Sequence, residues 1–580
     1  MPDKPFSAEP IVIVRIEQPF CSLSFGNAPC TATGTPCFNT YSTCGDQQNH
    51  TPGPTLDLYF GIPGQGKPSD EIMILPFLAG WPSTSSPRVN VSGADRRLNP
   101  LGLRATASIP FRDAPHTDFL VDPYLSTRSY DPIARGTFWS KWLTRNVFGK
   151  SGMTVSIFEG FAGQALADMV KRVYISDAVD FSGAETVLMK CRDILSKATD
   201  EKALMPPVSP GFLLADLDNN PATLTFKIAG AVLADYPASG TLRINDEILT
   251  YSALAEDVNG FIDVTVTSRA TDGSEIGSHE AEDSVQEVYR FDGVSVDVGL
   301  AAAYSYTTIP SARLPVADWA TEASLYLSAY VLDGLIPEPT AVEEVVGEIL
   351  EQAQAFQWWD EVAEEVRFRA VKPLTERPKR LTEDTGLIAG TVKIREFPER
   401  RVSRVYVFFD PRDPTSNEER NFRRVQGSLD LALEDAKAYG DKAIRKIIAR
   451  FINSTAVALE TTSRILARYK RGSREISFAV SDKDEDIEIG DVIEVVYHRD
   501  QDTTGAAKTS LWIVTSRDPK PAERRVYFVA EDATLAGQLL AISENSVGDY
   551  VGDGSDPFGV GWISDASGLL PNGDPGFTIQ

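Results

Sequence analysis

The sequence predicts a mostly β protein of several domains with some α+β elements. Segments rich in β-branched and aromatic residues recur along most of the chain, for example IVIVRIEQ at 11–18 and RVYVFF at 404–409. Only a few segments space their apolar residues three and four apart, as an amphipathic helix does. With 580 residues, 42% of them hydrophobic, the chain is long enough for about three to five domains.

The first two predicted domains cover residues 1–205 and 206–290. In the first, a strand over 6–20 precedes a cysteine-rich loop, further strands and a short helix at 138–146. Its last segment, 165–195, is predicted to add two strands and a helix that contains Cys191, which we interpret as an inert core thiol. Three prolines then separate a small β domain, in which a strand over 240–251 turns at Asn245-Asp246.

The remaining chain is divided at 375 and 535. Residues 291–375 are predicted to form an α+β domain, with helices over 319–332 and 340–356 and a hairpin over 357–371. Residues 376–535 read as a β-rich domain with a helical pair at 429–440 and 458–471, separated by AIRKIIARFI at 443–452. Residues 536–580 are rich in Gly, Asp, Ser and Pro and poor in basic residues, which predicts an extended tail.

Four of the five cysteines lie within one loop and form the strongest chemical signal. Cys21, Cys30, Cys37 and Cys44 are spaced C-x8-C-x6-C-x6-C, in a segment too polar to bury a core of its own. Two disulfides would require export, and the chain opens MPDKPFSAEP without a secretion signal. Structural zinc usually uses C-x2-4-C pairs, which are absent. The wider spacing favours an iron–sulfur cluster, while zinc and disulfides stay open as alternatives.

Two other groups of residues have compositions found in catalytic sites, but we interpret both groups as structural. Glu247, His279 and Asp283 lie in one β segment, but no nucleophile stands nearby, and we interpret them as turn and strand-end residues.

Trp358 and Trp359 precede Asp360 and Glu361, a composition typical of a sugar-binding platform with carboxylates. Adjacent residues of a strand point to opposite faces, so this pair is poorly arranged for hydrolysis. We interpret the tryptophans as packing anchors. The acidic run over 481–491 lacks the ligand spacing of an EF-hand and is interpreted as a solvated turn.

The charge balance and the motif content narrow the function classes. The 82 acidic and 56 basic residues give a net charge of −26, which argues against a nucleic-acid-binding surface but lets DNA slide past. No apolar run approaches 18 residues, so no membrane-spanning helix is expected. With four histidines, no nucleotide-binding glycine loop and no nucleophile elbow, the sequence does not predict an enzyme.

Several motifs, taken in order, resemble the tail hub proteins of long-tailed phages and gene transfer agents. They are the four-cysteine loop, LRATASIPFRDAPHTDFLVDPY at 103–124, RGTFWSKWLTRN at 135–146, SGTLRINDEILTYS at 239–252 and TSRATDGSEIGSHEAEDSV at 267–285. The last two match a recurrent tail-protein pattern at Gly240, Ile244, Glu247, Tyr251, Thr267 or Ser268, Arg269, Gly273 and His279. The chain departs from the pattern at Ala270, where relatives often carry Gly. The resemblance covers roughly residues 1–535.

The resemblance implies a fold, a cofactor and a set of partners. The fold would be a multi-domain tail hub of β-barrel-like domains, forming a trimeric ring with pseudo-sixfold symmetry, related to the lambda-type tail tip protein. Cys21, Cys30, Cys37 and Cys44 would hold an iron–sulfur cluster, with 4Fe–4S favoured over 2Fe–2S and zinc as the alternative.

The same resemblance implies a structural protein of the virion, located at the tail tip or baseplate and assembled in the host cytoplasm. A homotrimer would bind the distal tail protein, the tape measure protein and a central tip or fibre protein. DNA would pass only transiently through its channel, and no stable membrane association is implied. The alternatives are a tail-associated cell-wall hydrolase and an iron–sulfur redox protein.

Overall fold

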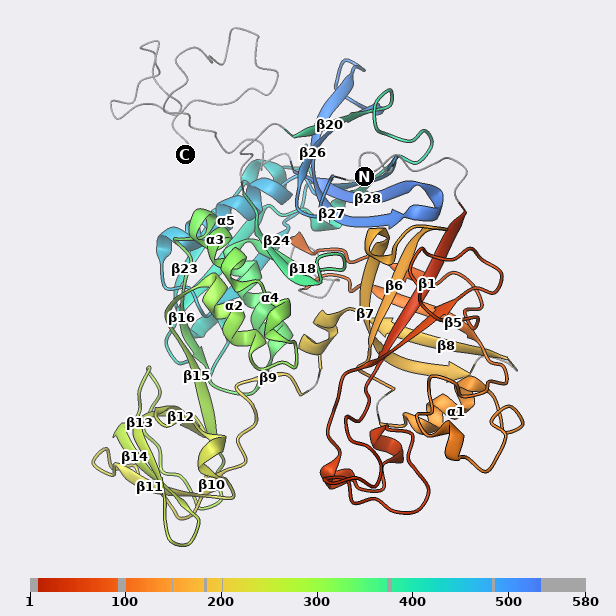
Figure 1. The fold of residues 1–580 in the computed structure, drawn as a ribbon. Coiled ribbons are helices and arrows are strands. Elements are labelled where there is room, and N and C mark those ends of the chain that lie inside the picture. The colour runs from red at the N-terminus through yellow and green to blue at the C-terminus, as the bar shows by residue number, and fades with distance from the viewer. Residues whose placement is uncertain are drawn as a thin grey trace.

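The computed structural model describes most of the chain, namely residues 9–91, 101–148, 150–181, 185–200, 202–372, 378–481 and 486–533. In these ranges the chain forms six β-sheets and five α-helices, which confirms the mostly β prediction (Figure 1). None of the α-helices described is long and apolar enough to cross a membrane. The predicted tail over 536–580 lies outside the described residues, as does part of the acidic run over 481–491.

The N-terminal sheet has eight strands in the order β3-β2-β1-β6-β7-β8-β5-β4. β1 lies between β2 and β6, and its first apolar residues are buried on both faces, which explains the continuous run IVIV. The strands are β1 Pro10–Gln18, β2 Leu56–Gly61, β3 Ile74–Leu75, β4 Ser83–Ser85, β5 Thr106–Arg112, β6 Thr154–Phe161, β7 Val170–Phe181 and β8 Thr186–Arg192.

Helix α1, Phe138–Arg145, packs against this sheet through an aromatic face. Asp113 stabilises the start of the helix. Its carboxylate accepts a hydrogen bond from the backbone N–H of Trp139 at 2.8 Å and one from the Thr137 hydroxyl at 2.6 Å. Trp139 is fully buried and stacks on Phe60 of β2, with ring centroids 5.4 Å apart. The face that α1 buries continues to its last residue, which brings Arg145 toward the cysteine loop.

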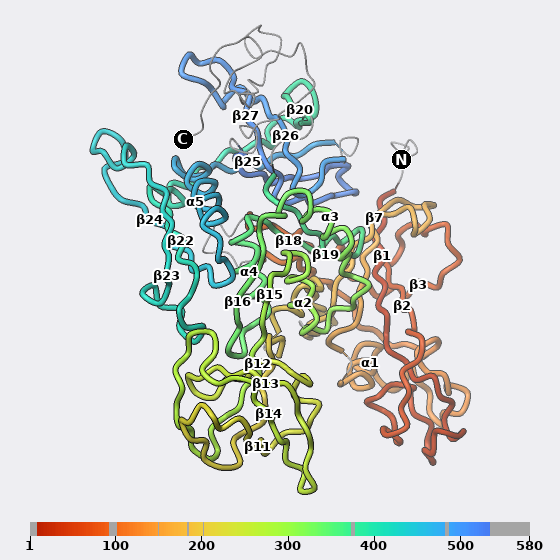
Figure 2. The backbone as a smooth tube through the Cα atoms, turned by 90° about the vertical axis from the view of Figure 1, so that its left-hand side faces the viewer, coloured from red at the N-terminus to blue at the C-terminus, as the bar shows by residue number. Residues whose placement is uncertain are grey.

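A seven-stranded sheet, ordered β10-β11-β14-β13-β12-β15-β16, contains the predicted small β domain. The long strand β15 pairs with β12 at its start and with β16 at its end, so it connects this unit to the centre of the molecule. Figures 1 and 2 place β11–β14 at the end of the molecule opposite the C-terminal sheet. The strands are β10 Phe212–Leu213, β11 Thr225–Ala229, β12 Gly240–Ile244, β13 Glu247–Glu256, β14 Ile262–Ser268, β15 Val285–Ser295 and β16 Val331–Ile336.

The centre of the molecule combines four helices with short sheets around one continuous core. Helix α4 contributes valine, isoleucine and leucine side chains at helical spacing, and the hairpin β18–β19 adds the buried Trp359. The helices are α2 Val296–Tyr304, α3 Val316–Tyr326, α4 Val342–Ala353 and α5 Thr455–Tyr469. The strands are β9 Leu204–Met205, β17 Thr340–Ala341, β18 Ala355–Asp360, β19 Glu365–Ala370, β22 Arg404–Pro411, β23 Phe422–Leu429 and β24 Ile444–Ala449.

The C-terminal sheet has six strands in the order β20-β26-β27-β28-β25-β21 and its own apolar core. Its last strand leads directly to the end of the described chain. The strands are β20 Lys379–Thr382, β21 Lys393–Phe397, β25 Ser473–Ser481, β26 Val492–Gln501, β27 Ala507–Lys520 and β28 Arg525–Asp532.

Several sequence predictions need correction. The segment predicted as a helix around Cys191 is strand β8, although the thiol is buried as expected. Residues 429–440 form only a 3-10 turn at Leu431–Glu434, and AIRKIIARFI contains strand β24 rather than a link between helices. The sheets of the described residues are open, so the expected barrel-like domains are not closed barrels.

A buried arginine connects the N-terminal sheet to the centre and to the C-terminal sheet. The Arg172 side chain on β7 is 0% exposed, and its guanidinium lies 3.6 Å from Glu159 on β6, 3.8 Å from Glu361 after β18 and 3.2 Å from Asp518 on β27. These four residues are termed the Arg172 junction. A cleft of about 360 Å³ adjoins it, lined in part by Trp358. Arg172 therefore joins the three parts through polar contacts that are largely buried, where charges interact more strongly than in water.

The junction predicts a pH dependence of stability that Glu361 controls. Burial raises the pKa of Glu361 to about 7, although the charge of Arg172 opposes the rise. The folded state then binds a proton that the unfolded chain releases, so this contribution is complete below pH 4.5 and is lost as the pH rises through 7. From pH 4.5 to 8, the free energy of unfolding should fall by about 3 kcal/mol more in the unaltered protein than in Glu361→Gln. Urea unfolding across this range measures the difference, and equal pH slopes would contradict it.

Candidate metal centre

The four clustered cysteines lie in the long connection between β1 and β2, beside helix α1 (Figure 1). All four thiols are free and partly buried, so no disulfide forms among them in the structure. Hydrogen bonds between backbone groups hold the connection: the Cys21 N–H donates to the Asn39 carbonyl at 2.8 Å, and the Cys44 N–H to the Tyr41 carbonyl at 3.2 Å. Local turns therefore contribute to the order of a loop that the sequence predicts to have no apolar core of its own.

The thiols are close enough to influence one another. Burial raises the pKa of the Cys37 thiol, a hydrogen bond from the Asn39 backbone opposes the rise, and the charges of Cys44, Cys21 and Cys30 add to it. Metal ligation requires thiolates, whose negative charge a bound cation would offset.

The sulfur atoms of the four loop cysteines are the candidate ligands of a metal centre. The Asp46 N–H points to the Cys44 sulfur at 3.4 Å, a contact of the kind that stabilises metal-bound thiolates. In the described ranges, no three His, Cys, Asp or Glu side chains stand as a group around a single ion position. Four free thiols from one loop fit the ligands of an iron–sulfur cluster. A cluster bound by Cys21, Cys30, Cys37 and Cys44 would cross-link the loop.

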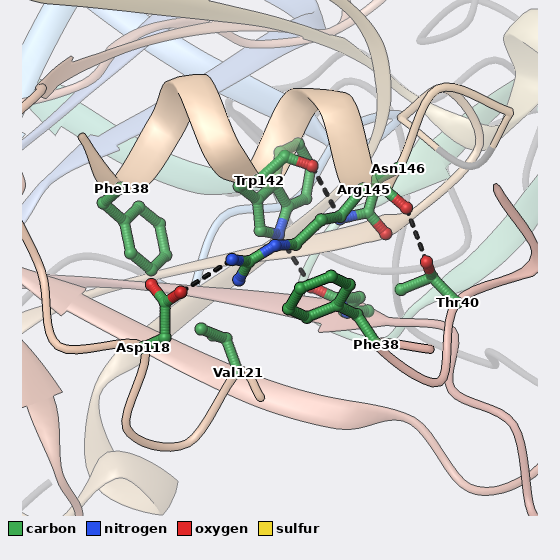
Figure 3. A pocket seen from close by; sticks show the side chains of 9 residues that line it. Phe38, Thr40, Asp118, Val121, Phe138, Trp142, Arg145 and Asn146 are labelled. Carbon is green, nitrogen blue, oxygen red and sulfur yellow. Dashed lines mark hydrogen bonds and ion pairs between the residues drawn. The ribbon is translucent and has the colours of Figure 1, made fainter. Parts of the chain in front are cut away.

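A second layer of side chains fixes the loop at Phe38, next to Cys37. The guanidinium carbons of Arg128 and Arg145 lie 4.1 Å and 3.9 Å from the centroid of the Phe38 ring. Asp122 pairs with Arg128 through two contacts of 2.8 and 2.9 Å, and Asp118 pairs with Arg145 at 2.6 Å. Figure 3 shows Arg145 extending from α1 between Asp118 and Phe38. These five residues are termed the Phe38 clamp.

Hydrogen bonds to the backbone complete this attachment. Arg128 donates to the Pro36 carbonyl at 2.6 Å and to the Cys37 carbonyl at 2.9 Å. The Thr40 hydroxyl donates to the Arg145 carbonyl at 2.6 Å, at the edge of a cavity of about 10 Å³ under the loop (Figure 3). The backbone around Cys37 is therefore held by α1 and by the segment 118–128, independently of any metal.

The structure brings Glu247 and His279 together, contrary to the expectation that turns separate them, and adds Arg269. Glu247 accepts hydrogen bonds from the Arg269 guanidinium at 2.6 and 2.8 Å and pairs with the His279 Nε2 at 2.9 Å. The carboxylate and the guanidinium are each 1% exposed. Burial favours a raised pKa of Glu247, but hydrogen bonds from Arg269, His279 and the Gly277 backbone outweigh it and lower the pKa to about 2. Asp283 instead accepts a hydrogen bond from Asn245 at 2.8 Å.

This buried network has a structural role. The contacts of the turn that contains Arg269 explain the residues at positions 270 and 273. Gly273 has φ +88°, and a Cβ there would lie 1.9 Å from the Arg412 carbonyl oxygen, so the turn fits closely against the chain near β22. Ala270, the departure from the tail-protein pattern, has φ +52° and donates its N–H to Glu247 at 3.2 Å. This left-handed conformation is one that glycine adopts at less cost.

The tryptophan pair is part of the packing, as predicted. Trp359 is 1% exposed and donates its indole N–H to the Val173 carbonyl at 3.1 Å, while Trp358 stacks on Phe356. Asp360 caps the hairpin turn by accepting two backbone N–H groups at 3.0 Å. Both tryptophans line the cleft of about 360 Å³ beside the Arg172 junction, but they are only 5% and 1% exposed, and Glu361 belongs to that junction.

Sequence reasoning missed the residues of the Phe38 clamp and also His50. The imidazole of His50 packs edge-on against Tyr41, and its Nε2 is buried without a hydrogen-bond partner among the described residues. The position of His50, six residues after Cys44, is the sequence feature that places this imidazole near the cysteine loop. Arg128 and Arg145 lie about 90 residues or more beyond Phe38, so no local pattern pointed to them.

Comparisons with known proteins found partial structural similarity to phage tail proteins. No family model and no curated protein matches the chain. The 43 kDa tail protein of prophage MuSo2 from Shewanella oneidensis aligns at 9% identity and a TM-score of 0.37, over 78% of this chain and 95% of that one. A tail protein from Neisseria meningitidis MC58 aligns at 8% and 0.35, over 74% and 88%.

A chain from the virion of a native gene transfer agent particle aligns at 12% identity and a TM-score of 0.29, over 53% of this chain and 77% of that one. All three TM-scores lie below 0.5, which is too low to carry an argument about function.

Proposed function

We propose that this protein is the structural hub at the tail tip of a long-tailed phage or gene transfer agent. As a homotrimer, it would join the sixfold tail tube and distal tail protein to a threefold central tip or fibre, with the tape measure protein above it. A trimer that presents two similar surfaces per subunit resolves such a symmetry mismatch. The net charge of −26 suits a channel through which DNA passes without binding.

One observation supports this proposal most strongly. Three polar residues of the tail-protein pattern, Glu247, Arg269 and His279, converge in one buried network, and Gly273 of the same pattern forms a tight contact between units of the chain. The pattern is therefore a folding unit and not a chance match of exposed turn residues. A resemblance based on such residues supports a shared architecture, and with it a shared structural role.

The cluster would be a structural cross-link in this proposal. The loop has no core, and ligation by four thiolates would contribute free energy of folding to it. A bound cluster would supply iron for covalent bonds to sulfur. The chain would supply the four thiolates and the Phe38 clamp that holds the loop.

Particles that carry Cys37→Ser should lose function. In complementation of particles that lack this protein, we expect the yield of DNA-delivering particles to fall by about tenfold or more, because the loop loses one of four ligands. Cys191→Ala is the matched control, since this thiol is 1% exposed on β8 and distant in sequence from the loop. Normal assembly and delivery by Cys37→Ser particles would overturn the structural role of the cluster.

A further inference from the structure

We infer that Arg128 is a positioning residue for the metal centre, holding the Cys37 ligand and offsetting the negative charge of the thiolates. The inference deepens the proposed function and rests on its metal centre. The Arg128 side chain engages three groups of the loop at once. Arg128 donates to two consecutive carbonyls, Pro36 and Cys37, and its guanidinium also contacts the Phe38 ring.

The position of Arg128 is itself fixed. Its side chain is 3% exposed, and its carboxylate partner Asp122 is 0% exposed. The Asp122 carboxylate also accepts the Tyr124 N–H at 3.0 Å, so the carboxylate is anchored to its own turn. A guanidinium held in this way has little freedom to follow a moving loop, and it restricts where the Cys37 sulfur can lie.

The charge of Arg128 acts on the loop directly. Arg128, Arg145 and Lys141 are three cations, and Asp118, Asp122 and Asp46 of the loop itself are three carboxylates, so these groups carry no net charge before the thiolates are counted. Arg128 is the cation that donates to the Cys37 backbone. A positive charge in that position lowers the cost of gathering thiolates and favours the reduced form of a cluster.

Two substitutions separate charge from position. Arg128→Lys keeps the charge but loses the fork that engages two carbonyls at once. Arg128→Gln loses both the charge and the fork. We therefore expect both variants to release iron to a chelator about tenfold or more faster than the unaltered protein. Only Arg128→Gln should also shift the midpoint potential of the cluster to a more negative value.

The experiment compares the full-length protein with these variants and with Arg135→Gln. Arg135 is exposed and lies seven residues from Arg128, and among the interactions described its guanidinium contacts only the Tyr130 ring. The readouts are iron release to bathophenanthroline, monitored by visible absorption, and potentiometric titration, with circular dichroism to confirm folding. Release rates and potentials of both Arg128 variants equal to those of Arg135→Gln would overturn the inference and leave the metal centre intact. An iron-free unaltered protein would overturn the metal centre as well.

Discussion

Replacing Arg172 by alanine should lower the free energy of unfolding by about 3–5 kcal/mol. The substitution leaves Glu159 and Glu361 buried together without the cation that lies 3.6 and 3.8 Å from them. It also removes the contacts that Arg172 makes with Asp518 and with the Pro519 carbonyl on β27, and therefore loosens the C-terminal sheet from the N-terminal sheet. Urea unfolding monitored by tryptophan fluorescence measures the loss.

Two further variants make this result specific. Arg420→Ala removes an arginine that is 86% exposed and pairs with Glu418, and it should change stability by no more than about 0.5 kcal/mol. Arg172→Lys keeps the charge without the planar fork and should fall between the two. An Arg172→Ala protein as stable as Arg420→Ala would show that the junction does not hold the three parts together.

Replacing Glu247 by alanine should destabilise the small β unit by a similar amount, about 3–5 kcal/mol. The Arg269 guanidinium, 1% exposed, would lose its only carboxylate partner among the described residues, and the N–H groups of Ala270 and Gly277 would lose their acceptor. Hydrogen exchange of the amides in β13 and β14 measures the effect locally, because the rest of the molecule has separate cores.

The pH dependence provides an independent check on Glu247. Its pKa is lowered to about 2, so its contribution is complete above the ordinary pKa of 4.5 and is lost as the pH falls through 2. Acid should therefore increase exchange in β13 and β14 of the unaltered protein more than in Glu247→Gln. The matched control is Glu256→Ala at the exposed end of the same strand. Equal exchange in Glu247→Ala and Glu256→Ala would contradict the structural role of the network.

The elements that the sequence predicts correctly are those in which local pattern and burial agree. The hairpin over 357–371 alternates apolar and polar residues in its second strand, and the structure forms β18 and β19 there. Helix α1 follows a threonine and presents tryptophans three residues apart, at 139 and 142 within its buried face. The position of the cysteine loop between the first two strands is confirmed as well.

The errors arise where helix-forming residues lie in an alternating pattern. VLMKCR is rich in Leu, Met, Lys and Arg, which favour helices, but in β8 every second residue is buried. AIRKIIARFI, interpreted as a separator between two helices, also buries every second residue, in β24. Residues 429–440 also favour a helix by composition, yet most of their side chains are exposed. A helix with no apolar face to bury gains little stability from propensity alone.

For the candidate metal centre, the sequence predicts the four thiols and none of the residues around them. The spacing of four cysteines is visible in the sequence, whereas the Phe38 clamp depends on residues 80 to 107 positions away that the fold brings to the loop. Similarly, the Arg172 junction joins residues from 159 to 518, and the one sequence pattern that includes a member, Glu361, did not indicate the other three. Long-range charge pairs of this kind follow from the tertiary structure, which local periodicity does not specify.

The central claim is that Cys21, Cys30, Cys37 and Cys44 hold an iron–sulfur cluster in a structural tail hub. Iron and acid-labile sulfide per chain, determined on protein purified without oxygen, test it most directly, together with the visible spectrum. We predict about four iron and four sulfide per chain and absorption at about 400 nm. The iron, the sulfide and the absorption should be lost in Cys37→Ser and retained in Cys191→Ala. Protein that contains about one zinc per chain, or no metal with its four thiols free, would contradict the claim.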